Sequence, residues 1–322
     1  MRTSVIILNY NGRGWLRRCV SAVLQQEGAF EIVVVDNASS DGSIEEIRSL
    51  PRVNVIQLSD NRGFAGGNNR GAEAARATDF LVFLNNDTEV QPGWLEALTH
   101  ALDERPDAGL ATSHITYLDD PHVIDSAGDG YLRAGGAFKR WHGQRRSPGP
   151  AVEHVFGACG AAFAIRRPVF QRLGGFDDDL FMVYEDVDLS YRAQLAGWRC
   201  VYVPHAVARH AGGATLGRES RSAVFYGQRN LEWVWLKNTP GAWLWRDALP
   251  HLAYSIAGCA YYSAHGHAVT CLRAKMTALG GAGAIWRKRH ALRPTASVRV
   301  RGLMTRRWWA VKRDERRRVG RR

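Results

Sequence analysis

Cysteine is scarce in this sequence, and its placement excludes two kinds of small scaffold. The 322 residues contain five cysteines, which are widely spaced and include no CxxC pair. Such spacing indicates neither a disulfide framework nor a zinc site. We therefore expect free thiols in a reducing compartment, in a chain long enough to bury a substantial core without cross-links.

Long apolar runs are missing as well. A fairly apolar stretch at residues 248–272 is interrupted by Pro250, His251, His265 and His267. Its uninterrupted part falls short of the ~20 residues that span a bilayer, so we expect no transmembrane helix. The N-terminus enters an apolar run within four residues, without a preceding basic segment, so we also expect no signal peptide.

Two common nucleotide-binding signatures are absent. No GK[ST] follows a glycine-rich loop, and no GxGxxG follows the first apolar run. Their absence argues against a P-loop NTPase and against the usual dinucleotide-binding fold.

Acidic residues are rare near the C-terminus. Residues 273–322 hold 17 Lys or Arg against two acids, a balance of +15, whereas the whole chain carries +12 and the first 272 residues therefore carry −3. A basic tail of this kind favours an anionic partner, either nucleic acid or an anionic membrane face. Trp286, Trp308 and Trp309 lie among the basic residues. Because this mixture is typical of interfacial anchors, we favour a membrane surface over a solvated tail.

The first part of the chain alternates between two apolar patterns. We expect buried parallel strands at the short apolar runs, which are residues 4–9, 31–36, 53–58 and 80–84. We expect helices between them, at residues 14–26, 44–49 and 66–77. The alternation predicts an α/β fold, a Rossmann-like, doubly wound and mostly parallel sheet.

The second part is expected to continue with mixed elements. The helical patterns are residues 92–103, 167–173, 185–195 and 220–236. Residues 155–165 form a strand-like run, residues 119–150 are glycine-rich and less periodic, and a loop carrying His210 is expected beyond Pro204.

Polar residues follow three of the expected strands. These clusters are Asn9-Tyr10-Asn11, Asp36-Asn37 and Asn85-Asn86-Asp87. Ligands of doubly wound sheets bind beyond the carboxyl ends of the strands. A carboxylate at that edge can bind Mg²⁺ or Mn²⁺ together with diphosphate oxygens and water, although Asn and Asp also end strands as turn formers.

Two further segments contain candidate catalytic or ligand-binding residues. Glu185, Asp186 and Asp188 lie at the start of an expected helix, where acids are also favoured by the helix dipole. These acids are therefore either functional carboxylates or solvent-exposed residues at the start of a helix, and the pattern alone does not decide between the two. Residues 60–71 are glycine-rich and precede a helix, which allows close backbone approach and offers N–H groups to an anion.

Taken in order, the motifs resemble those of the family-2 glycosyltransferases, in particular the bacterial rhamnosyltransferase-like branch that builds cell-surface polysaccharides. The matching segments are VIILNYNG (5–12), VVVDNASSDGS (33–43), NRGFAGGNNRG (61–71), FLNNDTEVQPGW (83–94), GACGAAFAIRR (157–167), GGFDDDLFMVYEDVDLSYR (174–192) and YGQRN (226–230). The resemblance covers roughly residues 3–235 and does not extend into the basic tail.

The resemblance implies a GT-A fold over residues 1–240, with a nucleotide-binding half (1–110) and an acceptor and catalytic half (111–240). A basic helical extension (241–322) follows, for which we expect docking on a membrane surface. The implied activity is an inverting hexosyltransferase that moves a sugar, rhamnose favoured, from a dTDP- or UDP-sugar to a glycan or polyprenyl-linked acceptor. The implied location is the cytoplasm, peripheral to the inner face of the plasma membrane.

The resemblance also implies roles for particular residues. Asp186 would be the general base, with Glu185 and Asp188 as alternatives. Asp87 and His210 would bind Mg²⁺ or Mn²⁺, although Asn85 replaces the first acid of the family's DxD motif and a lone histidine is often structural. The donor would be bound by Asn9, Tyr10, Asn11, Asp36, Asn37, Arg62, Gly63, Asn68, Asn86, Asp87 and Arg229, the last of which is alternatively a surface cation.

Two hypotheses of other classes remain open from the sequence. One is a nucleic-acid-binding protein that uses the basic tail, which leaves the acids at 185–188 without a role, so we expect no nucleic acid partner. The other is a catalytically inactive GT-A subunit, which the incomplete DxD motif allows.

Overall fold

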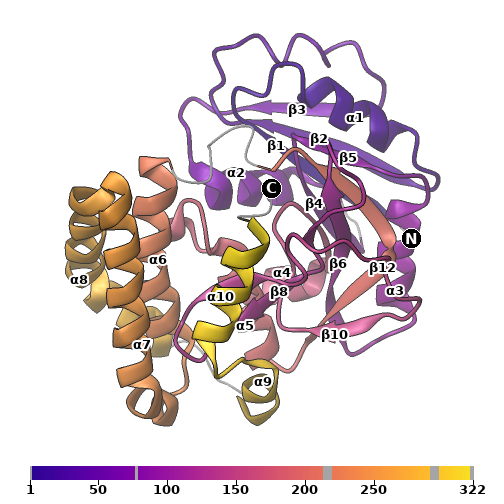
Figure 1. Ribbon diagram of the computed structural model, residues 1–322. Coiled ribbons are helices and arrows are strands. Elements are labelled where there is room, and N and C mark those ends of the chain that lie inside the picture. The colour runs from indigo at the N-terminus through magenta and orange to yellow at the C-terminus, as the bar shows by residue number, and fades with distance from the viewer. Residues whose placement is uncertain (1, 77–78, 213–219, 291–296, 320–322) are drawn as a thin grey trace.

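The computed structural model describes residues 2–76, 79–212, 220–290 and 297–319. Its strands are β1 (Thr3–Asn9), β2 (Phe30–Asp36), β3 (Val53–Gln57), β4 (Phe80–Asn85), β5 (Thr88–Val90), β6 (Ala108–Tyr117), β7 (Ile124–Ser126), β8 (Asp129–Tyr131), β9 (Ala137–Lys139), β10 (Glu153–Val155), β11 (Ala162–Arg166) and β12 (Arg199–His210). The main sheet has the order β10-β12-β6-β11-β4-β1-β2-β3, with β5 beside β12 and β7 beside β6. Figure 1 shows this sheet in the middle of the fold.

Helices cover both faces of the sheet. Those before the extension are α1 (Leu16–Leu24), α2 (Gly63–Ala74), α3 (Trp94–Asp103), α4 (Arg167–Leu173), the short η1 (Asp178–Leu180) and α5 (Glu185–Leu195). One apolar cluster joins α1 and α3 to one face, and a second joins α2, α4 and α5 to the other. Because Ile6 and Ile7 point to opposite faces and are both fully buried, the continuous apolar run of β1 is explained.

The N-terminal half of the sheet is parallel. β1 pairs in parallel with β2 and β4, and β2 pairs in parallel with β3. The second half is mixed, since β11 is antiparallel to β4 and β6, whereas β12 is parallel to β6. The predicted α/β fold is confirmed.

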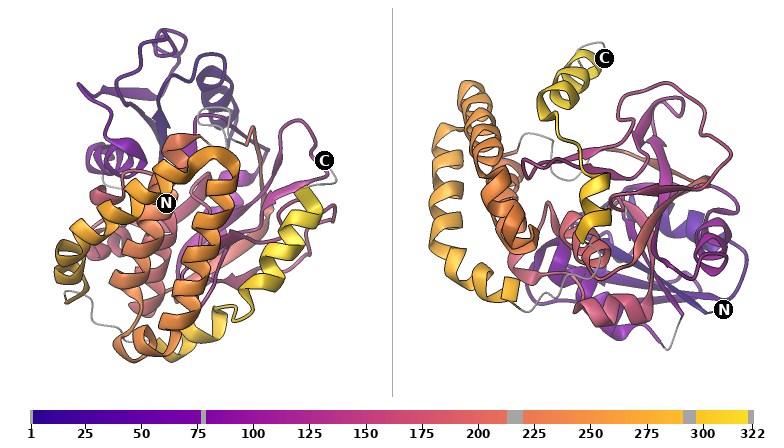
Figure 2. Two further views of the ribbon diagram at one scale, coloured as in Figure 1. Left: turned by 60° about the vertical axis from the view of Figure 1, so that its left-hand side comes forward. Right: turned by 90° about the horizontal axis from the view of Figure 1, so that it is seen from below.

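The C-terminal part of the chain is helical. It comprises α6 (Arg221–Asn238), α7 (Gly241–Tyr262), the short η2 (Ser263–His267), α8 (Ala268–His290), α9 (Ser297–Leu303) and α10 (Trp308–Val319). Helices α6, α7 and α8 stand together beside the sheet (Figures 1 and 2). A third apolar cluster joins α6, α8 and α9 to β8 and α5. Within the part of the chain that is described, no helix combines the length and hydropathy needed to cross a membrane.

Most of the expected elements are present, and α5 has the predicted bounds. The helix expected at 44–49 is wrong, because this segment forms turns in which Ile47 N–H donates to Ile44 O and Leu50 N–H to Ile47 O. A segment so short, followed at once by Pro51, cannot offset the cost of helix nucleation. Ala77, the expected end of the helix at 66–77, lies outside the described residues.

Two expectations in the second half are corrected. The run at 155–165 is split, because the N–H groups of Ala158, Cys159 and Gly160 donate to side chains rather than to a neighbouring strand. The loop expected beyond Pro204 is instead the continuation of β12, which has a register shift between Val203 and Val207. A proline is tolerated at such a bulge, so the strand continues to His210.

The glycine-rich stretch at 119–150 contains three short strands, β7, β8 and β9. The described cysteines are all free thiols, as expected.

Candidate active site

Asn9 organises the carboxyl edge of the parallel strands. Its side chain is fully buried, and its Nδ2 donates to Asp36 Oδ1 at 3.3 Å, Ser39 Oγ at 3.1 Å and Ser43 Oγ at 2.8 Å. Its Oδ1 accepts a hydrogen bond from Asn86 Nδ2 at 2.9 Å. The side chains at the ends of β1, β2 and β4 therefore meet, as the strand-end pattern predicts.

Asn37 fixes the start of α2. Its Oδ1 accepts from the Arg62 backbone N–H at 2.8 Å, and its Nδ2 donates to the Gly63 carbonyl at 3.1 Å. The N–H of Gly63 donates to Asn61 Oδ1, and the N–H of Ala65 donates to a backbone carbonyl. The expectation that this helix start offers free N–H groups to an anion is thus wrong for these three residues, whose donors already have acceptors.

The glycines of α2 serve helix packing. A Cβ atom on Gly67 would lie 2.3 Å from Leu8 Cδ1, and one on Gly71 would lie 2.4 Å from Ile6 Cγ2. Side chains at these positions would push α2 away from β1. Asn68, another predicted donor-binding residue, is buried and donates to the Phe64 carbonyl of its own helix.

Three of the predicted donor-binding residues are exposed, and these are Tyr10, Asn11 and Arg62. Asn11 adopts a left-handed backbone with φ of 51°, and its Oδ1 accepts from the Ser40 N–H. Arg62 is paired with Asp60 at 3.3 Å across exposed surface. The buried amides of this edge therefore hold the loops, and the exposed residues offer contact surface to a ligand.

Asp87 and His210 come together through strand pairing. Strands β5 and β12 are antiparallel, with Thr88 opposite His210, so the residue before Thr88 lies beside the histidine. Asp87 Oδ1 is 3.2 Å from His210 Nε2, and both side chains are buried. On the other side of the ring, His210 Nδ1 is 2.9 Å from Asp125 Oδ2. The imidazole is therefore held between two carboxylates.

Asp125 is the hub of this cluster. It is fully buried and its Oδ2 also accepts from Lys139 Nζ at 2.8 Å. Burial raises the pKa of Asp125, but the Lys139 ammonium and His210 outweigh burial and hold that pKa well below its usual range. Burial lowers the pKa of His210, but the hydrogen bond to Asp125 and the nearby Asp87 carboxylate raise it to about 9.

Asp186 is held by two backbone donors. Its Oδ1 accepts from the Val187 N–H and its Oδ2 from the Gly160 N–H, each at 2.7 Å. A Cβ atom on Gly160 would lie 2.9 Å from Asp186 Oδ2, so only glycine permits this approach. Burial raises the pKa of Asp186 although the two N–H groups oppose the shift. The side chain remains partly exposed, which leaves it accessible to a reactant.

The neighbouring acids differ from Asp186 in their surroundings. Glu185 is buried, and burial with repulsion from Asp186 raises its pKa well above the usual range. Asp188 is fully buried, and its oxygens accept from Arg192 Nε at 2.8 Å and face Lys237 Nζ at 2.7 Å. Its side chain is thus committed to an internal ion-pair network, which does not suit the alternative of Asp188 as a base.

The turn before α5 has an unusual backbone. Phe181, Val183 and Tyr184 have φ values of 62°, 64° and 79°, and such conformations cost on the order of 1–3 kcal/mol each. Asn230 Nδ2, on α6, donates to three carbonyls of residues 180–183 at 2.6–2.9 Å. The turn that presents Asp186 is therefore held by α6.

Arg229 supports the same region. Its Nη2 donates to the carbonyls of Asp179 and Leu180, and its guanidinium lies 4.1 Å from the Trp233 ring centroid. The side chain is buried, so the alternative of a surface cation is wrong. Gly63 lies against this turn too, since a Cβ there would be 2.3 Å from the Phe181 carbonyl oxygen.

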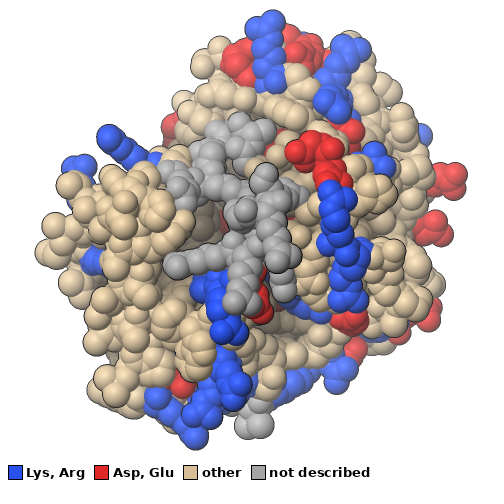
Figure 3. Space-filling view, viewed as in Figure 1, with Lys and Arg blue, Asp and Glu red and all other residues tan. Residues whose placement is uncertain are grey.

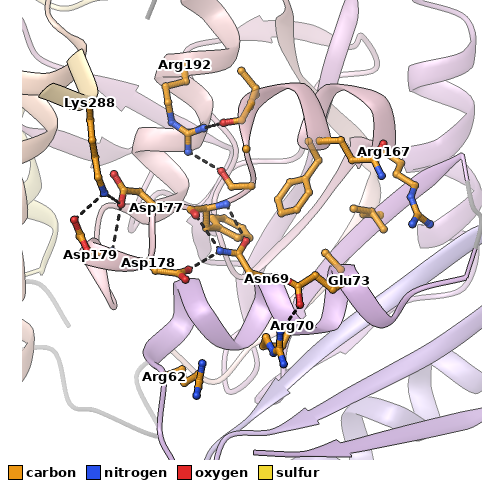
Figure 4. A pocket seen from close by; sticks show the side chains of 18 of the residues that line it. Arg62, Asn69, Arg70, Glu73, Arg167, Asp177, Asp178, Asp179, Arg192 and Lys288 are labelled. Atoms are coloured by element: carbon orange, nitrogen blue, oxygen red, sulfur yellow. Dashed lines mark hydrogen bonds and ion pairs between the residues drawn. The ribbon is translucent and has the colours of Figure 1, made fainter. Parts of the chain in front are cut away.

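A groove of about 850 Å³ lies between α2, α4 and η1. Figure 4 shows that several of its charged side chains face one another or the backbone. Arg70 pairs with Glu73, Lys288 pairs with Asp177, and the Arg192 guanidinium donates to backbone carbonyls. Of the predicted site residues only Arg62 is among those that line it, so the groove is separate from the carboxylate cluster.

Sequence reasoning missed several residues of the cluster. Asp125 and Lys139 belong to none of the motifs that match the family, and Asp129, whose pKa is raised well above its usual range by burial and by Asp186, lies in the same irregular stretch. Asn230 ends the YGQRN motif, and that match was a signal for it.

Comparisons with known proteins agree with this geometry. A sequence model of glycosyl transferase family 2 matches residues 4–174, just over half of the chain. An N-acetylglucosaminyl-diphospho-decaprenol L-rhamnosyltransferase of Mycobacterium tuberculosis is 29% identical over 76% of this chain and 87% of its own length.

Two solved structures share the fold. GalNAc-T7 with UDP, GalNAc and Mn²⁺ superposes with a TM-score of 0.58 at 19% identity, covering 74% of this chain and 50% of that one. The mannosyltransferase PcManGT from Pyrobaculum calidifontis, with GDP-Man and Mn²⁺, has a TM-score of 0.55 at 17% identity, covering 90% and 84%. With the family match and the mixed sheet described above, these findings show that the chain belongs to glycosyl transferase family 2 and is a glycosyltransferase of GT-A fold.

Proposed function

We propose that the protein transfers a sugar, with inversion, from a nucleoside-diphosphate donor to a hydroxyl of a lipid-linked glycan acceptor. The observation that carries this proposal is the buried cluster of Asp87, His210, Asp125 and Lys139, whose lysine is also close enough to Asp186 to lower the pKa of that carboxyl group against the effect of burial. Lys139 lies close enough to Asp125 and Asp129 for both to raise its pKa, although burial opposes them. The catalytic unit would be residues 1–240, with the donor at the carboxyl edge of β1, β2 and β4.

The residues present fit a divalent cation held by two protein ligands. Neighbouring ligand atoms around an octahedral ion lie about 3 Å apart when each is about 2.1 Å from the metal, and Asp87 Oδ1 and His210 Nε2 are 3.2 Å apart. Among the described residues, His210 Nε2 has no partner in hydrogen-bonding geometry. Its other nitrogen is oriented by Asp125, an arrangement typical of metal-binding histidines.

A cation held by two side chains needs further ligands from the donor. No set of three or more His, Cys, Asp or Glu in the described parts of the chain is arranged as a complete metal site. Diphosphate oxygens and water suit Mg²⁺ or Mn²⁺ as the remaining ligands. When bound, the ion would neutralise the charge that develops on the leaving diphosphate.

Asp186 is the proposed general base. In a single displacement, the acceptor oxygen forms a bond to the anomeric carbon, the bond to the diphosphate oxygen breaks, and the acceptor proton passes to the carboxylate. Asp186 is accessible and oriented by two N–H donors, whereas Asp188 is fully buried. Arg229 and Asn230 would act through the turn that they hold, rather than on the diphosphate.

A cavity next to Asp129 and Lys139 is the proposed acceptor site, and Asp186 is not one of its lining residues. The cavity has a volume of about 340 Å³ and is lined in part by Asp129, Phe138, Lys139 and Trp141. Aromatic faces and charged groups are the elements with which proteins bind sugars. The M. tuberculosis relative is named for a decaprenyl-diphosphate-linked acceptor, so we propose a polyprenyl-linked glycan here, with dTDP-rhamnose or a UDP-sugar as donor. The enzyme would then work at the inner face of the plasma membrane.

The proposal is tested by donor binding. A bound ligand raises the melting temperature of the native protein, so the purified chain is melted with UDP-, dTDP- and GDP-sugars, with and without Mn²⁺. We expect one nucleotide class to stabilise the protein in a Mn²⁺-dependent manner, and we expect Asp87→Ala to lose this effect. Glu89→Ala, two residues away and partly exposed, is the matched control and should keep it.

If no donor shifts the melting temperature, with or without the metal, the protein is better described as an inactive GT-A subunit. Salt-sensitive binding to DNA or RNA in that case would support the nucleic-acid hypothesis.

A further inference from the structure

Helices α7 and α8 form a hairpin whose apolar side chains are on the outside. Apart from Tyr10, every large hydrophobic side chain classed as exposed in the described structure lies on α7, α8 or α10. Those on α7 are Trp245, Leu249, Leu252 and Ile256, and those on α8 are Val269, Leu272, Met276, Leu279 and Trp286. The spacing of three, four or seven residues places each set on one face of its helix.

The inner face of α7 is polar. Asp247 is paired with Arg301 at 2.7 Å, and His251 Nε2 is 2.7 Å from Glu232 on α6. Ser255 Oγ donates to the same glutamate. A soluble protein normally turns the apolar face of a helix inward and the polar face to water, so α7 has the reverse arrangement.

The inner face of α8 includes small residues where it meets α6, together with the buried Ile285. Ala274 and Ala278 are buried against α6, and the Ala278 carbonyl accepts from Trp233 Nε1 at 3.0 Å. A Cβ on Gly281 would lie 2.5 Å from the Trp233 ring. Close packing through small residues, with large apolar residues outside, is the pattern of helices that associate in an apolar medium.

The border of this surface is basic. Residues 248–272 contain no Asp, Glu, Lys or Arg, whereas Arg246, Arg273 and Arg287 flank the apolar residues and are exposed. Figure 3 shows that the surface over α7 and α8 is mostly uncharged, with Lys and Arg mainly near its margins. Trp245, near the start of α7, and Trp286, near the end of α8, both belong to the open end of the hairpin, away from η2, and tryptophan is favoured at a membrane interface.

We propose that this outer surface of α7 and α8, the hairpin face, docks on an anionic lipid bilayer and lies in its interface without crossing it. No described helix is suited to crossing, and an apolar face with basic borders is the signature of an interfacial helix. A second copy of the chain is a poorer occupant, because two identical faces would bring the same basic borders together without acidic partners.

Docking through the hairpin face would add a membrane-binding step to the proposed sugar transfer. The choice of a lipid surface rests in part on the lipid-linked acceptor proposed above, which would be presented from the same bilayer. Because α6 carries both the hairpin contacts and Asn230, the docked helices and the turn before Asp186 belong to one packed unit. Docking would then bring the transferase site to the membrane plane.

The test is flotation of the full chain with vesicles. One set contains phosphatidylglycerol and phosphatidylcholine, and the other contains phosphatidylcholine alone. We expect binding to the anionic vesicles, and we expect the quadruple variant Leu249→Gln, Ile256→Gln, Leu272→Gln and Leu279→Gln to lower the partition coefficient about tenfold or more. These side chains are 59–79% exposed, so the melting temperature should change little.

The basic border is tested with a matched pair. Arg273→Gln with Arg287→Gln should weaken binding to anionic vesicles roughly tenfold. Arg48→Gln with Arg52→Gln removes the same charge from exposed positions in the segment between β2 and β3 and should leave binding unchanged.

Three results would overturn the proposal. Vesicle binding that survives the quadruple variant would assign docking to another part of the chain. A dimer in sedimentation velocity that this variant abolishes, without vesicle binding, would make the face a self-association surface. A monomer that binds neither type of vesicle would also contradict the proposal. Flotation requires neither donor nor acceptor, so each of these results can occur while donor binding and transfer are intact.

Discussion

Large apolar side chains are buried in the sheet but exposed on the α7–α8 hairpin. Phe83 and Phe163 are fully buried and stack at 5.2 Å between ring centroids, whereas Leu249 and Leu279 are 79% and 70% exposed. Burial of apolar surface stabilises the sheet. The hairpin is instead held to α6 by ion pairs and by packing of small residues. The stability of the sheet therefore depends on its large apolar side chains, whereas the stability of the hairpin does not depend on its exposed ones.

The largest expected effect compares one truncation in each region. Phe163→Ala should lower the free energy of unfolding by about 3–5 kcal/mol, because it removes a fully buried ring. Leu249→Ala should change it by less than about 0.5 kcal/mol, as is usual at exposed positions. Urea unfolding of the two variants checks the comparison, and similar losses would show that the hairpin face is buried in solution.

The polar attachment of the hairpin should be sensitive to acid. Burial raises the pKa of Glu232, but His251 and Lys275 outweigh burial and lower it from 4.5 to about 2. Since the folded pKa is depressed, this stabilisation is complete above pH 4.5 and is lost as the pH falls toward 2. The shift corresponds to at most roughly 3 kcal/mol.

Melting temperatures at pH 6 and pH 3 measure this contribution. Glu232→Gln should lose less stability than the wild type over this interval. An equal loss in both proteins would show that Glu232 does not anchor α7 and α8 to α6.

A smaller effect on stability, but a clear one on catalysis, is expected from Asn230→Ala. The variant removes the side-chain donor of the Met182 and Val183 carbonyls and one of the donors of the Leu180 carbonyl, which should cost about 1–3 kcal/mol. Because the turn carries Asp186, kcat should fall while the KM for the donor stays near the wild-type value.

Asn238→Ala is the matched control for that prediction. Asn238 is also a buried amide on α6, but it donates to Asp188 rather than to the turn. It should lose stability and keep its kcat. Equal losses of kcat in both variants would contradict a positioning role for Asn230.

The strands and most of the site could be predicted from the sequence because they depend on local patterns. Apolar runs located β1, β2 and β4, and the strand-end residues Asn9, Asp36 and Asn86 do meet. The periodicity of residues 185–195 gave the bounds of α5.

What local patterns could not predict depends on pairing between distant segments, and only the family resemblance puts His210 and Asp87 at one site. His210 faces Asp87 because β5 pairs with β12, and Asp125 reaches the same ring from β7. No local pattern marks these contacts. The sequence predicts membrane docking of residues 241–322 but not which face docks, since spacing shows that α7 has an apolar side but only packing shows which side meets α6.

The central claim is sugar transfer with Asp186 as the general base, and its most direct test is the transfer rate. The wild type and Asp186→Asn are compared at saturating dTDP-rhamnose or the donor that stabilises the protein best, with N-acetylglucosaminyl-diphospho-decaprenol as acceptor. We predict that the variant binds donor normally and transfers about 10²–10⁴-fold more slowly. A variant that transfers at the wild-type rate would contradict the account.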